Sequence, residues 1–279
     1  MRRVTVDALE PGDAAIVGVP WDEQSSFLRG ARLGPEALRR ALGADSTNWC
    51  TESGRDLSEE PRLAHVGDVD LTPDIPAEEA IATIEQGISA VLKRGARALS
   101  VGGDHAVSYP VIRAHAAVHN RLSIVHLDAH PDLYDEFKGS RYSHACPFAR
   151  VMEQGLASRL VQVGVRTATP HQRAQAARFG VEMIEMRHWS QGGLPALEGP
   201  VYLSLDLDVL DPAHVPGVSH PEPGGMTTRD VIAVIQSLRG RLVGADVVEL
   251  NPTRDPTGIT ALVAAKFVKE IADRLLESR

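Results

Sequence analysis

The chain has 279 residues, of which 43% are hydrophobic and 24% are charged, so it can bury a substantial core. Its formal net charge of −8 argues against nucleic acid or an anionic membrane as the main partner. The only cysteines are Cys50 and Cys146, which is too few for a disulfide framework and fits a reducing compartment.

The beginning of the chain, MRRVTVDALEPGDAA, has two arginines but no long apolar segment after them. No stretch approaches the roughly 18 apolar residues that a membrane span needs. We therefore expect no standard signal peptide and no membrane insertion, and the predicted location is the cytoplasm.

Apolar runs rich in β-branched residues alternate with segments of helical periodicity along the whole chain. Eight strands are predicted, at residues 13–19, 63–66, 96–101, 122–125, 160–165, 181–186, 201–205 and 242–248. Helices are predicted at residues 34–43, 77–94, 107–119, 147–155, from 170 onward, 227–238 and 258–276. Such alternation implies βαβ units and a parallel sheet with helices on both faces. Because no repeat or linker divides the sequence, we expect a single three-layer α/β domain over residues 1–279.

The stretch LSIVHLDAHPD, at residues 122–132, joins a buried strand to residue types that bind metals. Its first half is apolar and β-branched, and it leads directly into Asp128, His130 and Asp132. On an extended strand these alternate residues would point to one side, whereas in a turn they would converge on one point. Either geometry places two carboxylates and an imidazole at the carboxyl end of a strand, where open α/β sheets bind ligands.

Further acids and imidazoles stand at the ends of other predicted strands. They are His105, the pair Asp206 and Asp208, and Glu249. Because a parallel sheet gathers the carboxyl ends of its strands at one edge, these groups are expected to meet. So many carboxylates need cations to share one small site, and two divalent ions would neutralise them. The oxygen-rich set favours Mn²⁺ over structural Zn²⁺, and a two-metal site that activates water indicates hydrolysis.

The sequence resembles the ureohydrolases, the family of arginases and agmatinases. The motifs that support this resemblance cover almost the whole chain: GVPWDEQSSFLRGARLGP, GGDH, DAHPD, YSHACPF, SLDLDVLDP, EPGG and ELNP. DAHPDLYDEFKGSRYSHA, RLVQVGVR, PGVSHPEPGG and GADVVELNPTRD are most similar to plant-type arginases, whereas RGARLGPEALR and HACPF are closer to bacterial agmatinases. The resemblance implies an arginase-like fold and the hydrolysis of a small cationic guanidino substrate to urea and an amine.

The resemblance also assigns residues to two Mn²⁺ per subunit. It implies that one ion is held by His105, Asp128, Asp132 and Asp206, and the other by His130, Asp128, Asp206 and Asp208, with Asp128 and Asp206 bridging. Asp132 would take a hydrogen bond or a proton from the attacking hydroxide, and Glu249 would pair with the substrate guanidinium. His144 would move protons to the leaving amine or to bulk water. Relatives form trimers or hexamers, so we expect a homo-oligomer.

Arginine is the favoured substrate, slightly ahead of agmatine. The two differ in the α-carboxylate, which needs donors or a cation at the rim of the site; Ser140 and Arg141 are the candidates, with Arg29 as a further residue at the mouth. An agmatinase, another guanidino-acid hydrolase and a catalytically silent metal-binding relative are the alternatives. A metallophosphoesterase fits less well because GGDH precedes D-x-H in this chain, and a zinc deacetylase because the chain has no HH dipeptide.

Three further residues near these motifs have simpler expected roles. His126 is expected to pack in the core or contact a metal ligand rather than bind a metal itself. Cys146 stands two residues after His144, but the acid cluster already provides a water nucleophile, so no thiol chemistry is expected. His220 stands where many relatives have threonine.

Overall fold

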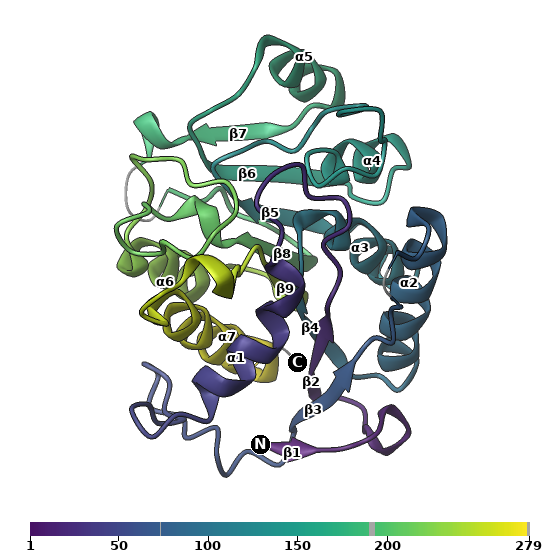
Figure 1. The fold of residues 1–279 in the computed structure, drawn as a ribbon. Coiled ribbons are helices and arrows are strands. Elements are labelled where there is room, and N and C mark those ends of the chain that lie inside the picture. Colours follow the sequence, from purple (N-terminus) through teal and green to yellow (C-terminus); the bar gives the residue numbers. More distant parts are fainter. Residues whose placement is uncertain (73, 190–192, 278–279) are drawn as a thin grey trace.

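A parallel sheet forms the centre of the molecule, for which a computed structural model describes residues 1–72, 74–189 and 193–277 (Figure 1). Within these residues its nine strands are β1 (Arg2–Arg3), β2 (Ala14–Val19), β3 (Leu63–Asp68), β4 (Arg97–Gly102), β5 (Ser123–Leu127), β6 (Arg159–Val165), β7 (Glu182–Glu185), β8 (Pro200–Asp206) and β9 (Arg241–Val248). The predicted runs account for eight of them. The short edge strand β1 was not predicted, because its two arginines show no apolar pattern.

The order of the strands across the sheet brings distant parts of the chain together. It is β1-β3-β2-β4-β9-β8-β5-β6-β7, and all neighbouring strands are parallel. Strand β9 therefore lies between β4 and β8, with Val247 beside Val101 of β4 and Val248 beside Asp206 of β8. Because every strand runs in the same direction, all the carboxyl ends share one edge of the sheet.

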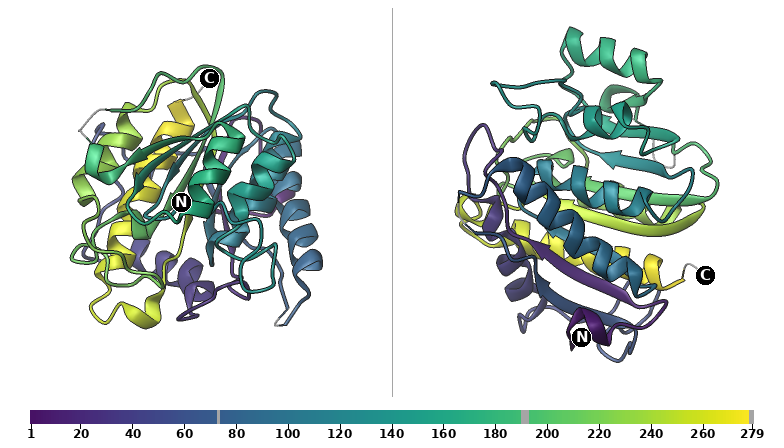
Figure 2. Two further views of the ribbon diagram at one scale, coloured as in Figure 1. Left: turned by 90° about the horizontal axis from the view of Figure 1, so that it is seen from above. Right: turned by 90° about the vertical axis from the view of Figure 1, so that its right-hand side faces the viewer.

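Helices cover both faces of the sheet, which confirms the predicted three-layer arrangement (Figure 1; Figure 2). They are α1 (Gly34–Leu42), α2 (Ala77–Lys93), α3 (Ser108–Ala116), α4 (Pro147–Glu153), α5 (Pro170–Phe179), α6 (Thr228–Ser237) and α7 (Ile259–Glu277). Helices α1, α6 and α7 lie on one face, where Leu38 and Phe267 join one apolar core. Helices α2 to α5 lie on the other, where Ile84 and Phe148 join a second core. Among the described helices, none has the length and apolar character needed to cross a membrane.

Local sequence signals fix the ends of several helices. Helices α5 and α6 each begin with a capping box, formed by Thr169 with Gln172 and by Thr227 with Asp230. Pro110 is tolerated because it lies in the first turn of α3, where a backbone N–H has no partner within the helix. These signals set where the loop before each helix ends, and so which residues remain in the loops at the carboxyl edge of the sheet.

Candidate active site

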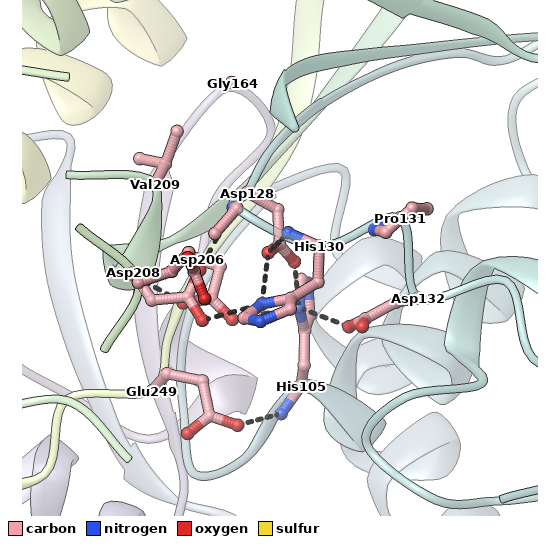
Figure 3. Close-up of polar contacts among 12 residues, drawn as sticks. His105, Asp128, His130, Pro131, Asp132, Gly164, Asp206, Asp208, Val209 and Glu249 are labelled. Carbon is pink, nitrogen blue, oxygen red and sulfur yellow. Dashed lines mark hydrogen bonds and ion pairs between the residues drawn. The ribbon is translucent and has the colours of Figure 1, made fainter. Parts of the chain in front are cut away.

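Four neighbouring strands at the centre of the sheet, β4, β9, β8 and β5, end at one cluster of acids and imidazoles (Figure 3). His105 follows β4, Asp128 follows β5, Asp206 is the last residue of β8, and Glu249 follows β9. Figure 3 shows their side chains directed toward one another, although they come from distant parts of the sequence. The structure thus brings together groups that the sequence placed at separate strand ends.

The Nδ1 atom of His105 is the meeting point of three carboxylates. It lies 3.0 Å from Asp128 Oδ2, 3.0 Å from Asp132 Oδ2 and 3.1 Å from Asp206 Oδ2. The atom is buried and has no hydrogen-bond partner in suitable geometry among the described residues. One ring nitrogen holds at most one proton, so it cannot serve three carboxylates at once. A nitrogen lone pair and three oxygens directed at one point form instead a candidate set of ligands for a cation.

A second group of potential ligands shares Asp128 with the first. His130 Nδ1 lies 3.0 Å from Asp208 Oδ2 and 3.3 Å from Asp128 Oδ1. Asp128 therefore directs one oxygen toward His105 and the other toward His130, as a carboxylate that bridges two cations would. Asp206 directs Oδ2 toward His105, while its Oδ1 accepts a hydrogen bond from the backbone of Asp208.

The proton affinity of this cluster also fits a cation site. Burial, and then the neighbouring Asp208 and Asp128, raise the pKa of Asp206 well above its usual value. Burial, and then Asp206, likewise raise the pKa of Glu249. Burial together with Asp128 raises the pKa of Asp132 to about 6. Carboxylates packed this closely therefore hold extra protons unless positive ions replace them.

Asp128 is held in place by a histidine outside the ligand groups. Gln162 donates from its amide nitrogen to the carbonyl of Pro131 and to Nδ1 of His126, at 3.0 Å. Nδ1 of His126 is thus an acceptor, so its proton is on Nε2, which donates to Asp128 Oδ2 at 2.9 Å. The ring of His126 also stacks on the ring of Phe148, with the two centroids 3.8 Å apart. His126 contacts a potential ligand, in the way expected from the sequence.

His105 has a similar buried support, which the sequence reasoning missed. Its Nε2 lies 3.1 Å from Ser204 Oγ, and Ser204 donates to Asp246 Oδ1 at 2.7 Å. Tyr202 donates to the other oxygen of Asp246 at 2.6 Å. The sequence did contain a signal for this support. Ser204 and Asp246 are polar residues within the largely apolar strands β8 and β9, and buried polar residues need hydrogen-bond partners.

A cavity of about 220 Å³ opens beside the cluster. The residues that line it are Ser26, His130, Asp132, Tyr134, Phe137, His144, Ala145, Thr167, Thr169, Gln172, Asp206, Asp208, His220 and Glu249. The sequence prediction included the acids and His144 but not Ser26, the two aromatic residues or residues 167–172. Residues 167–172 follow β6, which lies beside β5 in the sheet. Ligands bind at the carboxyl ends of parallel strands, so the residues after β6 could have been predicted in the same way as those after β5.

His144 lies in this cavity in contact with two residues from other loops. Its Nε2 is 2.9 Å from Ser26 Oγ, and its ring stacks on His220 with centroids 4.5 Å apart and an interplanar angle of 18°. Ser26 Oγ also lies 3.5 Å from His220 Nε2. Burial, and then His220, lower the pKa of His144 to about 3, so its ring is neutral at neutral pH.

The structure gives the predicted substrate contacts of Ser140 and Arg141 no support. Among the described residues, neither lines the cavity. Ser140 donates to Gln24 Oε1 at 2.7 Å, and Arg141 pairs with Glu153 of α4 at 2.9 Å. The reason is a tight turn between Phe137 and Ser140, closed by two backbone hydrogen bonds, whose direction the sequence did not reveal. Arg29, the third candidate, pairs with Glu23 at the surface.

Cys146 is buried but is poorly suited to act as a nucleophile. Burial raises the pKa of its thiol to about 12. Its Sγ contacts the backbone carbonyl of Ser140 at 3.7 Å. A thiol in this state supplies almost no thiolate at neutral pH, in agreement with the expectation that it has no chemical role.

Comparison with known proteins places this geometry in a family. The model of the arginase family matches residues 12–273. Arginase 1 (mitochondrial) of Arabidopsis thaliana is 45% identical over 276 residues, which cover 94% of this chain and 80% of that protein. Guanidinopropionase of Pseudomonas aeruginosa is 38% identical, covering 94% and 86%. The solved structure of the arginase from Medicago truncatula has a TM-score of 0.89 at 43% identity, covering 94% of this chain and 87% of that one.

These matches, together with the sheet and its cluster, define a hydrolase that acts on the C–N bonds of small guanidino compounds. The resemblance inferred from motifs is thereby confirmed. The chain belongs to the arginase family.

The predicted cytoplasmic location is contradicted by the same comparisons. Two relatives from Arabidopsis thaliana are named "Arginase 1, mitochondrial" and "Arginase 2, chloroplastic/mitochondrial", so these relatives are organellar rather than cytoplasmic. The prediction rested on net charge, two cysteines and the residues at the beginning of the chain. The first two features fit any reducing compartment, so they do not separate the cytoplasm from the interior of an organelle.

Proposed function

We propose that the chain is a binuclear manganese hydrolase that cleaves L-arginine to ornithine and urea. The observation that carries this proposal is the convergence of three carboxylates on His105 Nδ1, with Asp128 shared between His105 and His130. Similarity to plant arginases over 94% of the chain supports arginine as the substrate.

The two overlapping ligand groups define which residues would hold the ions. His105, Asp128, Asp132 and Asp206 would hold one Mn²⁺, and His130, Asp128, Asp206 and Asp208 the other. Carboxylate oxygens with a minority of imidazole suit Mn²⁺. When bound, such a pair of ions supplies a hydroxide nucleophile near neutral pH.

Three residues of the cavity would then position the substrate and move protons. Glu249 accepts a hydrogen bond from the backbone of His105 through Oε1, while its buried Oε2 has no partner among the described residues. A guanidinium would provide the missing donor, and the contact would orient the guanidinium carbon. Asp132 would accept a proton from the attacking water. The neutral ring of His144 would take up a proton and then deliver it to the leaving amine.

Another guanidino acid is the second candidate substrate. The observation that favours it is the 38% identity to guanidinopropionase, over 94% of this chain. Agmatine is the third, and it differs from both in having no carboxylate.

We also propose that residues 1–279 form one ureohydrolase domain and that the subunits assemble as a trimer or hexamer. The first follows from a sequence that no repeat or linker divides, and the second from the family resemblance. Light scattering on the purified protein measures the assembly directly.

The test is a substrate panel after manganese loading. We expect about two Mn²⁺ per chain by elemental analysis, and faster urea release from arginine than from agmatine or 3-guanidinopropionate. Asp128→Asn is expected to lower the metal content and abolish turnover together, because it changes the shared ligand. Asp45→Asn, at an exposed position, is the control and is expected to change neither. Bound metal without urea from any guanidine would contradict the function, and faster turnover of agmatine would overturn the choice of substrate.

A further inference from the structure

An aspartate is buried in the middle of the sheet, two residues before the strands β8 and β9 end. Asp246 of β9 pairs in register with Ser204 of β8, and both strands lie at the centre of the sheet (Figure 1). Both residues are 0% exposed. Burying a carboxylate among apolar residues costs free energy, and groups buried at such a cost are often part of a functional site. The contacts of Asp246 indicate what it does.

Two hydroxyl groups fix the direction of the hydrogen bonds around this carboxylate. A carboxylate only accepts, so Ser204 donates to Oδ1 at 2.7 Å and Tyr202 donates to Oδ2 at 2.6 Å. A serine has one hydroxyl proton, so Ser204 must accept at its other contact, which is Nε2 of His105 at 3.1 Å. The proton of the neutral His105 ring is therefore on Nε2, and Nδ1 keeps its lone pair.

This lone pair is the imidazole ligand of the first proposed cation. Nδ1 of His105 faces the carboxylates of Asp128, Asp132 and Asp206. A proton on Nδ1 would compete with the cation, because a histidine ligand binds a metal through a nitrogen that carries no proton. A carboxylate that attracts the proton on the far side of the ring also makes the ring a stronger ligand. The chain of hydrogen bonds from Asp246 to His105 therefore prepares Nδ1 for a cation.

We propose that Asp246 is a positioning residue for the cation at His105: through Ser204 it keeps the ring proton on Nε2 and so raises the affinity for that ion. Tyr202 completes the arrangement, because it occupies Oδ2 and leaves Oδ1 to Ser204. Among the described residues that line the cavity, Asp246 is absent, so it acts only through its neighbours. The inference rests on the metal site of the proposed function but not on the choice of substrate.

The test uses Asp246→Asn, which keeps the shape of the side chain but replaces one oxygen with an amide N–H₂ group. Tyr202 still donates to the remaining oxygen, so the amide nitrogen faces Ser204 and donates to it. Ser204 then donates to Nε2 of His105, and the ring proton moves to Nδ1. We expect the affinity of the metal-stripped full chain for Mn²⁺ at His105 to fall about ten- to a hundredfold, as for other partners of metal-binding histidines. Isothermal titration with manganese chloride measures this affinity without turnover.

A second substitution separates this role from a structural one. Tyr202→Phe alone leaves Asp246 in contact with Ser204 and is expected to keep the wild-type affinity. When Tyr202→Phe is added to Asp246→Asn, the amide is free to turn its oxygen toward Ser204, so the affinity is expected to recover. The double variant has nevertheless lost a buried hydrogen bond and is expected to unfold at a lower denaturant concentration than Asp246→Asn. A defect of packing would not move affinity and stability in opposite directions.

Two further variants complete the comparison. Ser204→Ala removes the middle of the chain and is expected to lower the affinity for Mn²⁺ whether or not Tyr202→Phe is present. Asp45→Asn makes the same change as Asp246→Asn at an exposed position and is expected to keep the wild-type affinity.

The possible failures can be distinguished from one another. A wild-type chain that binds no Mn²⁺ would contradict the proposed function, and this inference with it. If the wild-type chain binds two ions and Asp246→Asn binds them equally tightly, only this inference is overturned. An equal loss of affinity in Asp246→Asn and in the double variant would show that Asp246 has only a structural role, which overturns the inference as well.

Discussion

The hydrogen bond between His144 and Ser26 joins two loops that are far apart in the sequence. The loop of Ser26 is held in turn by Asn251, which donates to the carbonyl of Leu28 at 2.7 Å, and by Ser219, which donates to the same carbonyl at 3.0 Å. The position of His144 thus depends on side chains from three separate segments. This support suits the proton-transfer role proposed for His144, because such a group acts only within hydrogen-bond distance.

We predict that His144→Asn lowers kcat about a hundredfold, the scale of general acid–base catalysis, while the metal content stays near two per chain. Ser26→Ala is expected to lower kcat by a smaller factor, because it frees the ring of His144 without removing it. Steady-state urea assays and elemental analysis measure the two effects. Full activity of His144→Asn across neutral pH would show that His144 is not the proton carrier.

At the scale of single residues, the sequence predicted the groups that follow buried strands and missed those whose direction depends on a loop. The positions of Asp128 and Asp206 could be predicted from the sequence, because a parallel sheet places the carboxyl ends of all its strands at one edge. The position of Gln172 in the cavity could not, because it depends on how α5 leaves β6. The outward direction of Arg141 depends on the turn before it, which no apolar pattern records.

The capping box at the start of α6 shows how an element is anchored beside the cavity loops. Thr227 Oγ1 accepts from the backbone N–H of Asp230 at 3.1 Å, and the backbone N–H of Thr227 donates to Asp230 Oδ2 at 2.9 Å. The helix covers the sheet next to α7, and the loop before it includes His220. The helix predicted at residues 227–238 begins at this capping box.

We predict that Thr227→Ala lowers the free energy of unfolding by about 1 kcal/mol, because one backbone N–H at the helix start loses its acceptor. Thr228→Ala changes the next residue, which is inside the helix, and is expected to stay within about 0.5 kcal/mol of wild type. Chemical denaturation followed by circular dichroism measures both. Equal losses in the two variants would show that the capping hydrogen bond does not account for the effect.

Most strands and helices could be predicted from the pattern of apolar residues in the sequence. Strands buried on both faces are mostly apolar, and the helices between them have an apolar stripe and marked ends. The two-residue strand β1 was not predictable, since Arg2 and Arg3 join the sheet only through backbone pairing with β3. The order of the strands was likewise outside the reach of the sequence, because long crossings determine it.

At the scale of the whole molecule, stability depends on pH through buried histidines. His115 of α3 is fully buried against Tyr202, and its Nδ1 lies 2.9 Å from the carbonyl of Val111. Burial lowers its pKa to about 4 from the usual 6.5. Between these two pH values the folded chain binds fewer protons than the unfolded chain. The free energy of unfolding therefore falls as the pH falls, and His115 accounts for about 3 kcal/mol of this loss by pH 4.

We predict that His115→Asn loses less stability than wild type when the pH is lowered from 6.5 to 4. Asparagine keeps a donor for the carbonyl of Val111 but takes up no proton. His188→Asn, at an exposed histidine, is expected to show the wild-type slope. Denaturant midpoints across this pH range give the slopes, and identical slopes for all three proteins would refute the assignment to His115.

The place of β9 in the sheet has a consequence for how the acid cluster is assembled. Without β9 the sheet would divide into two groups of four strands, β1-β3-β2-β4 and β8-β5-β6-β7, and the inner edge of each group would have no partner. His105 belongs to the first group, whereas Asp128 and Asp206 belong to the second. Insertion of β9 joins the groups, covers both edges and delivers Glu249. The acid cluster is therefore complete only in a chain in which β9 has joined the sheet.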